Sequence, residues 1–155
     1  MENEMPGRVL LVAVVSLLSV ASLPLAAADQ PAVAYITARY ADTPEPGAKA
    51  RYSPRIEKLW AACTKKEKKT GDPCMDFDIW VNAQDWEIKN LKIEPLKSDA
   101  KTAGVLASFD NFDRHEDINF RLIKDNKGWM VDDISTGCEM LSDVLKGKPS
   151  TCSNQ

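Results

Sequence analysis

The stretch "AGVLASFDNFDRHEDINFRLIKDNKGWMVDDI", residues 103–134, decides the fold. Within it, apolar side chains recur at every second position over 103–109 and again over 118–122, and "WMVDDI" (129–134) is a further short run of this kind. Such alternation is typical of strands that bury one face. The segment "DNKG" is a tight hairpin signal, and the longer "NFDRHED" separates the first two runs. The stretch therefore predicts consecutive antiparallel strands.

A further strand is predicted ahead of this stretch. Trp86 and Ile88 share one phase of a two-residue period, and Leu91 and Ile93 share the opposite phase. A shift of one residue near Asn90 would bring all of these apolar side chains to one face, so we expect a β-bulge there. With the strands that follow, this gives a four-stranded meander.

Two helices are predicted before the strands. The first covers residues 31–42, which carry apolar side chains near helical spacing, and it ends before "DTPEPG". The second begins at Ser53, whose hydroxyl can cap open N–H groups, and continues with Pro54, which needs no N–H partner there. Its apolar stripe is expected to be buried and consists of Ile56, Leu59, Trp60 and Cys63.

A short helix is predicted after the strands. Thr136 and Glu139 fit a capping box, and Gly147 is placed to end the helix. Its apolar stripe consists of Met140, Leu141, Val144 and Leu145. The order of elements indicates an α+β fold, with an antiparallel four-stranded curved sheet packed on N-terminal helices and a short C-terminal helix. This single domain is expected to cover residues 29–147, followed by a polar tail at 148–155.

The first 28 residues have the pattern of a signal peptide. The apolar run over 9–25 is short for a membrane span and is followed directly by Ala26-Ala27-Ala28, a small-residue cleavage pattern. We expect cleavage after Ala28, a periplasmic or secreted mature chain, and no transmembrane segment after cleavage; a retained anchor helix is the alternative. The formal net charge of −3 at pH 7 does not indicate binding to nucleic acid.

All the cysteines follow the predicted cleavage site: Cys63, Cys74, Cys138 and Cys152. An even number of cysteines in an exported chain indicates disulfides. Their spacing does not match the close pairs of zinc sites, and no metal or other cofactor is predicted. We predict the bonds Cys63–Cys74 and Cys138–Cys152, with a cross-pairing such as Cys63–Cys138 left open.

The segment "DFDIWVNAQDW" (76–86) concentrates polar and aromatic side chains. Asp78 can cap a short helix "IWVN", and the other polar residues can satisfy backbone groups where that helix turns into a strand. We favour this structural interpretation over a ligand site, and we expect both tryptophans to belong to the core. The candidate binding residues are Trp80, Asn82, Gln84, Asp85 and Trp86, together with Asp132 and Asp133.

Catalysis is not predicted. His115 lies in a polar turn and the cysteines are expected to be oxidised, so the chain offers no nucleophile with a base held beside it. Successive strand residues point to opposite faces, so only one of Asp132 and Asp133 is expected to face the concave side of the sheet. Carboxylates of the 76–86 segment could join that inward aspartate and raise its pKa for proton transfer.

Three segments carry a resemblance: "RYSPRIEKLW" (51–60), "DFDIWVNAQDWEI" (76–88) and "GWMVDDI" (128–134). In this order they resemble a family of exported bacterial domains of unknown function, whose members have Y-[ST]-P opening a helix, L-D-F-D-P-[FW]-V-[NG]-x-Q-D-W, and G-W-x-[IV]-x-D-I before a final helix. Met75 and Ile79 depart from that pattern, and the cysteine framework is not part of it. The resemblance covers most of residues 31–147. It implies a cone fold of the nuclear-transport-factor or cystatin-like type, and it implies no general activity.

These observations predict a noncatalytic periplasmic binding or accessory domain for an envelope protein or a small molecule. One alternative is an immunity or inhibitor protein against an envelope-targeting enzyme, with an exposed acidic patch around His115. That patch would consist of Asp110, Asp113, Glu116 and Asp117. The other alternative is a cone-fold isomerase or hydrolase that uses an inward aspartate. We expect the second helix to leave only a shallow or closed cavity; an open one above about 300 Å³ with an inward aspartate would favour the enzyme.

Overall fold

The structure is a computed structural model that describes residues 30–151. The predicted signal peptide (1–28) and Cys152 lie outside the described residues. The elements are α1 (Gln30–Tyr40), α2 (Pro54–Thr70), β1 (Ile88–Ser98), β2 (Thr102–Asn111), β3 (Arg114–Asp125), β4 (Gly128–Ser135) and α3 (Leu141–Val144). Within this described part, no helix is long and apolar enough to cross a membrane. The element order confirms the α+β prediction.

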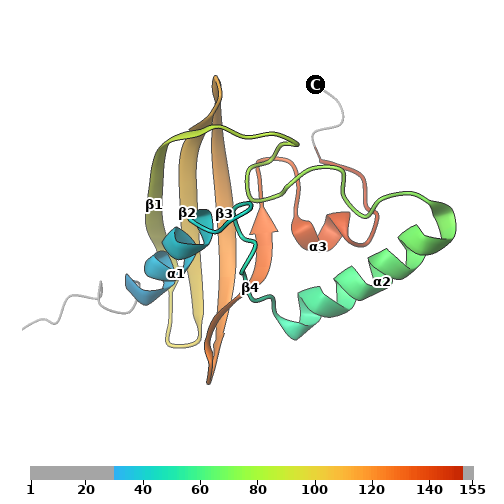
Figure 1. Cartoon of the computed structure of the whole chain (residues 1–155). Coiled ribbons are helices and arrows are strands. Elements are labelled where there is room, and N and C mark those ends of the chain that lie inside the picture. The colour runs from blue at the N-terminus through green and yellow to red at the C-terminus, as the bar shows by residue number, and fades with distance from the viewer. Residues whose placement is uncertain (1–29, 152–155) are drawn as a thin grey trace, which may run out of the picture.

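The strands form one antiparallel sheet in the order β1-β2-β3-β4, which confirms the meander (Figure 1). β2 and β3 pair without interruption from Thr102 opposite Ile123 to Asn111 opposite Arg114. Gly128 follows the β3–β4 turn with a φ of 118°, a conformation that residues with a side chain rarely adopt. The turn chemistry and the alternation therefore specify the same register.

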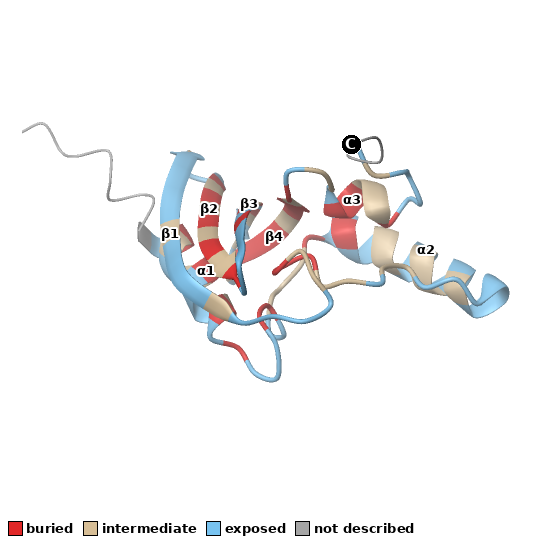
Figure 2. Cartoon of the chain, turned by 90° about the horizontal axis from the view of Figure 1, so that it is seen from above, coloured by how far each residue is buried: buried red, intermediate tan, exposed pale blue. Residues whose placement is uncertain are grey.

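The core lies between α1 and one face of the sheet. α1 packs across β1 and β2 (Figures 1 and 2). Tyr40 closes the end of this layer, with its ring edge-on to Phe109 at 5.7 Å and to Phe120 at 6.1 Å between centroids. The other buried apolar side chains of this layer include Ala32, Ile36, Ala103, Val105, Ala107, Ile118 and Leu122. Removal of these surfaces from water is the main stabilising contribution to the fold.

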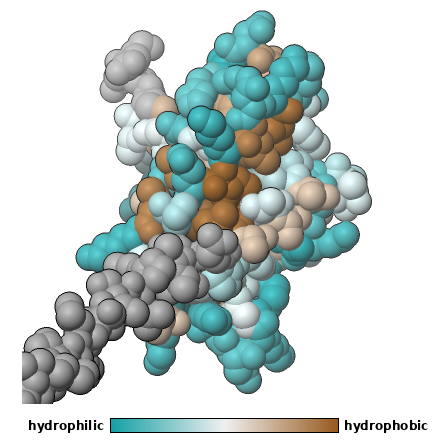
Figure 3. Space-filling model, turned by 90° about the vertical axis from the view of Figure 1, so that its left-hand side faces the viewer, coloured by the Kyte–Doolittle hydropathy of each residue, from teal (hydrophilic) through white to brown (hydrophobic). Residues whose placement is uncertain are grey.

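The edge strand β1 contains the predicted bulge. Lys89 lies opposite Asp110 and Lys92 opposite Ser108, so β1 holds one residue more than β2 over this span. The expectation that the bulge brings every apolar residue to one face is wrong, because Leu91 lies within the bulge and is 38% exposed. Figure 3 views the side of the molecule on which β1 lies, where apolar surface gathers at the centre among hydrophilic side chains.

Helix α2 begins and ends as its sequence predicts, but it takes a different course. The Ser53 hydroxyl accepts a hydrogen bond from the Ile56 N–H at 3.3 Å, and Gly71 ends the helix in the left-handed conformation. Of the predicted buried stripe, only Ile56 is fully buried, because α2 passes β4 with its first turns and then projects away from the sheet (Figure 1). The concave side is therefore filled by α1.

The last helix is shorter than predicted. The Thr136 hydroxyl accepts from the Glu139 N–H at 3.0 Å, and the Thr136 N–H donates to the Glu139 carbonyl at 2.9 Å. These bonds close a turn, and Ser135 pairs with Met140 in an isolated bridge, so the helix begins only at Leu141. Met140 is consequently exposed, whereas Leu141 and Leu145 are buried.

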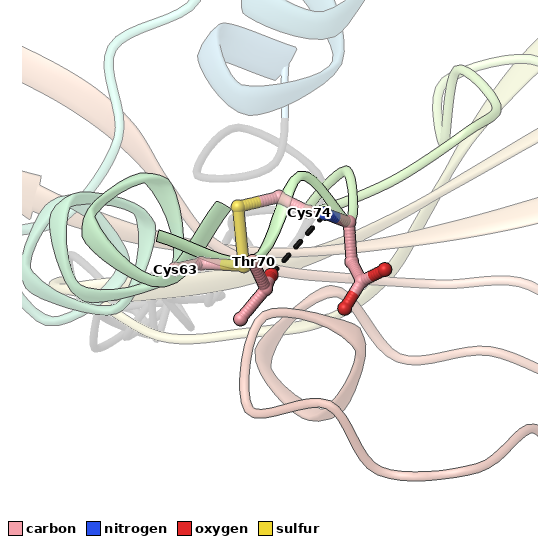
Figure 4. Close-up of a disulfide and its surroundings, with 4 residues drawn as sticks. Cys63, Thr70 and Cys74 are labelled. Atoms are coloured by element: carbon pink, nitrogen blue, oxygen red, sulfur yellow. Dashed lines mark hydrogen bonds between the residues drawn. A yellow bond between two sulfur atoms is a disulfide. The ribbon is translucent and has the colours of Figure 1, made fainter. Parts of the chain in front are cut away.

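The predicted Cys63–Cys74 disulfide is present, with 5.6 Å between the Cα atoms. Figure 4 shows that it joins the outer part of α2 to the segment that returns after it, beside a hydrogen bond of 3.2 Å from the Asp72 N–H to the Thr70 hydroxyl. This bond excludes the Cys63–Cys138 alternative. Pairing of Cys138 with Cys152 involves a residue outside the described part and stays a prediction.

Candidate functional site

An open groove of about 700 Å³ lies between the 45–52 loop, the first turns of α2 and the 75–86 segment. The expectation of a shallow or closed cavity is wrong, because α2 projects outward instead of filling this space. The inward aspartate of β4 that would favour an enzyme is not found, since neither Asp132 nor Asp133 lines the groove. The lining side chains are chiefly aromatic and acidic: Tyr52, Trp60, Phe77, Trp80 and Trp86, with Glu45, Asp76 and Asp78.

A tight turn over residues 78–83 contributes Asp78, Ile79 and Trp80 to the lining of the groove. The Asp78 N–H donates to the Ala83 carbonyl at 2.9 Å, and the Ala83 N–H returns a bond to the Asp78 carbonyl at 3.3 Å. The carboxylate Oδ1 of Asp78 accepts from the Trp80 N–H at 2.8 Å. The predicted helix "IWVN" is therefore absent, and Asp78 stabilises a turn instead. Asn82 adopts a φ of 53° within this turn, which asparagine tolerates better than most residues.

Trp80 separates the groove from the core. Its ring lies 4.6 Å from that of Phe120, and its backbone carbonyl accepts from the Tyr40 hydroxyl at 2.9 Å. On the groove side, the indole N–H donates to the Tyr52 hydroxyl at 3.0 Å. Gly47 leaves room for this indole, since a Cβ at that position would lie 2.2 Å from Trp80 Cε2. Burial raises the pKa of Tyr52 to about 12, so its hydroxyl stays protonated at neutral pH.

The candidate binding residues predicted from the sequence separate into three places. Trp80, Gln84 and Trp86 line the groove. The expectation that both tryptophans belong to the core holds for Trp80 and is wrong for Trp86, which is 37% exposed. Asn82 lies behind it and donates to Glu116 Oε2 at 2.8 Å, and the exposed Asp85 contributes its carbonyl, which accepts from Asn111 Nδ2 at 3.3 Å. Asp132 and Asp133 lie on β4 and are not among the residues that line the groove.

The carboxylate of Asp78 is the most perturbed acidic group of the groove. Burial raises its pKa, the hydrogen bond from the Trp80 N–H opposes that rise, and the charge of Glu45 adds to it. Its Oδ2 is buried and has no hydrogen-bond partner in the described structure. The sequence indicates Asp76 and Asp78 as candidate carboxylates but does not indicate Glu45 or Tyr52, and Gly47 in "DTPEPG" predicts only the end of a helix. Nothing in the sequence marks the 45–52 loop as a partner of the 75–86 segment.

Asp132 and Asp133 act together, contrary to the alternation expected of strand residues. Arg121 pairs with Asp133 and Leu122 with Val131, so Asp132 is the extra residue of a β-bulge. Both carboxylates consequently reach Arg55, at 3.2 Å from Asp132 and 3.0 Å from Asp133. Arg121 approaches Asp132 at 2.8 Å. These ion pairs link β4, β3 and the start of α2, so the cluster stabilises the fold.

The acidic patch around His115 is also changed by the structure. Glu116 is buried and is bound by Asn82 and by Arg114, so it is not available on the surface. The hydrogen bond with Asp110, at 3.1 Å, raises the pKa of the exposed His115. No group of three or more histidine, cysteine, aspartate or glutamate side chains in the described part could hold a metal ion.

Comparisons with known proteins give no family assignment. No protein-family model matches the chain, and no curated protein matches it. Among solved structures, the chain is similar to the phospholipid-binding protein from Ralstonia solanacearum in complex with a phospholipid, with a TM-score of 0.36 and 18% identity. The similarity covers 61% of this chain and 50% of that protein, so the chain spans about half its length. At this level the similarity carries no functional argument, and the resemblance to exported bacterial domains stays a prediction.

Proposed function

We propose that the protein is an exported, noncatalytic binding domain that takes a small molecule into the aromatic groove. The observation that carries this proposal is the groove itself, whose volume of about 700 Å³ is within the range of ligand pockets. Aromatic side chains from three separate segments converge on it, and Trp80 is held in place by bonds on both its core and its groove side. A held wall of this kind limits the entropy that a ligand loses on binding.

The proposed compartment is the periplasm or the exterior. The Cys63–Cys74 disulfide supports it, because such bonds persist mainly in oxidising environments. The predicted signal peptide and the motifs shared with exported bacterial domains support the same proposal, and we include membership of that family in it.

Binding by the groove can be tested with the neutral fluorescent probe N-phenyl-1-naphthylamine. We expect saturable binding to the mature, oxidised protein. Ala48→Phe should weaken it at least about tenfold, because Ala48 is exposed on the groove lining and a phenyl ring there would occupy the ligand's space. Ala61→Phe is the matched control, since Ala61 is exposed on α2 and does not line the groove. Equal binding by both variants would refute the groove as the site.

A second candidate is an isomerase or hydrolase that uses Asp78 for proton transfer. The raised pKa of this buried carboxylate and its unpartnered Oδ2 favour it, since such groups occur at catalytic sites. Any compound found to bind the groove should then be converted by the wild-type protein and recovered unchanged after incubation with Asp78→Asn. Recovery of unchanged compound from both proteins would refute the enzyme candidate and leave binding as the proposed function.

A further inference from the structure

The groove has a single sign of charge. Glu45, Asp76 and Asp78 contribute carboxylates to its lining, and none of the described residues that line it is lysine or arginine. Neither Glu45 nor Asp76 forms a side-chain hydrogen bond or ion pair with another described residue, and both are exposed. Burial is the main cause of the raised pKa of Asp78, and the charge of Glu45 adds to it, so these two carboxylates repel each other. A positive charge between them would relieve this repulsion.

The aromatic walls favour the same sign of charge. Tyr52 and Trp60 lie with ring centroids 5.7 Å apart and an interplanar angle of 45°, so their faces form an angled pair. Trp80 is 3% exposed and bonded through its N–H to Tyr52, so the partly exposed rings of Tyr52 and Trp60 are the ones that a ligand can contact. The faces of tryptophan and tyrosine carry negative electrostatic potential and attract organic cations.

We propose that the groove prefers a small organic cation, an amine or quaternary ammonium group attached to an apolar body. This inference rests on the proposed function of the groove and adds the class of ligand. The carboxylates of Glu45 and Asp76 receive the cationic group at the rim, Asp78 adds its charge from within the wall, and the rings of Trp60 and Tyr52 contact the apolar body. A free cation is proposed as the ligand, because carboxylates interrupt the apolar and aromatic lining of the groove.

The inference can be tested by comparing 2-phenylethylamine with its neutral analogue 2-phenylethanol. Displacement of N-phenyl-1-naphthylamine at pH 7 would measure both affinities. We expect the amine to bind about tenfold more tightly than the alcohol, a difference of about 1.4 kcal/mol. The double variant Glu45→Gln/Asp76→Asn should bring the amine-to-alcohol ratio close to one. Glu94→Gln/Asp113→Asn removes the same net charge from exposed positions outside the groove and should leave the ratio unchanged.

The outcomes separate this inference from the proposed function. Equal affinity for amine and alcohol, both weakened by Ala48→Phe, would overturn the cation preference and leave the groove as a binding site. An amine preference that both double variants lose equally would assign it to net charge and overturn the inference. If phosphatidylcholine vesicles displace the probe and free choline does not, the cation that the groove binds is a lipid headgroup. That result would overturn the choice of a free ligand. Probe binding that Ala48→Phe does not weaken would remove both proposals.

Discussion

Asp133 on β4 and Asp78 beside the groove are both withdrawn from solvent, but their surroundings differ. Asp133 Oδ1 accepts from the N–H groups of Ile134 and Ser142, and its Oδ2 lies 3.0 Å from Arg55. The carboxylate of Asp78 accepts one hydrogen bond, from the Trp80 N–H to Oδ1, and its Oδ2 has no partner among the described residues. One carboxylate therefore has its charge compensated by the fold, and the other keeps an uncompensated oxygen next to a groove.

The two aspartates therefore differ in what their carboxylates contribute to the stability of the fold. A buried carboxylate with every oxygen bonded stabilises the elements that it joins, whereas an unpaired buried oxygen lowers stability. Proteins concentrate such costs at sites where a ligand or a reaction uses them. The aspartates of "WMVDDI" belong to the first kind and Asp78 to the second.

The largest effect is expected from removing the carboxylate of Asp133. Asp133→Ala should lower the free energy of unfolding by about 2–3 kcal/mol, because the buried N–H of Ser142 loses its acceptor and Arg55 loses a buried partner. Urea denaturation would measure the change. Arg121→Ala serves as the control and should cost less than about 1 kcal/mol, since Arg121 is largely exposed. A change below about 0.5 kcal/mol for Asp133→Ala would contradict the structural assignment of this cluster.

A second prediction concerns the support behind the groove. Asn82→Ala should destabilise the protein by about 1–2 kcal/mol, because it removes the hydrogen bond to buried Glu116 and places an alanine at a φ of 53°. Asn82→Gly loses the same hydrogen bond without the backbone strain. The two variants, compared by urea denaturation, should therefore differ, with glycine the less damaging. Equal losses would show that the strain contributes nothing.

The third prediction tests the unpaired oxygen of Asp78. Asp78→Ala should lower stability by about 1 kcal/mol, because the Trp80 N–H loses its acceptor, whereas Asp78→Asn can keep that bond and removes the charge. In thermal unfolding at pH 7, the melting temperature of Asp78→Asn should equal or exceed that of the wild type. A melting temperature for Asp78→Asn as low as that of Asp78→Ala would show that the charge is compensated.

The pH dependence should distinguish the two carboxylate sites. Because the pKa of Asp78 is raised on folding from an ordinary 3.8, the wild type loses stability relative to Asp78→Asn as pH rises through the interval above 3.8, and the difference is constant at higher pH. Asp132 has the opposite sign. Burial alone would raise its pKa, but hydrogen bonds from Ser53 and Arg55 and the charge of Arg121 lower it, so its contribution is lost as pH falls below 3.8. Melting curves over this range would show both signs.

The smallest effects are expected at the exposed polar residues of the 76–86 segment. Gln84→Ala and Asp85→Asn should each change the free energy of unfolding by less than about 0.5 kcal/mol. Gln84 makes one exposed bond to the Asp76 carbonyl, and Asp85 acts through its backbone, which the substitution keeps. A loss above about 1 kcal/mol at either position would instead support the interpretation that the polar side chains of the whole segment stabilise the fold.

Local patterns predicted the sheet well and the groove poorly. The alternation of Val105 to Phe109, the hairpin at Gly128 and the cap at Ser53 each depend on neighbours within a few residues, so the sequence contains them. The direction of α2 and the partners of Trp80 depend on contacts between segments tens of residues apart, for which no local pattern exists. Asp132 illustrates this limit of local patterns. Strict alternation predicts that Asp132 and Asp133 face opposite sides, but the bulge at Asp132 lets both carboxylates reach Arg55.

The position of the disulfide has a practical consequence for anyone preparing this protein. Cys74 directly precedes Met75, the first residue of the 75–86 groove wall, and Cys63 holds it to the outer part of α2. In a reducing cytosol this wall would lose its covalent bond to α2. Protein expressed there would be expected to give weak or scattered binding data without any change in sequence. Ligand screens should therefore use material folded in an oxidising compartment, with a thiol titration as the quality check before each measurement.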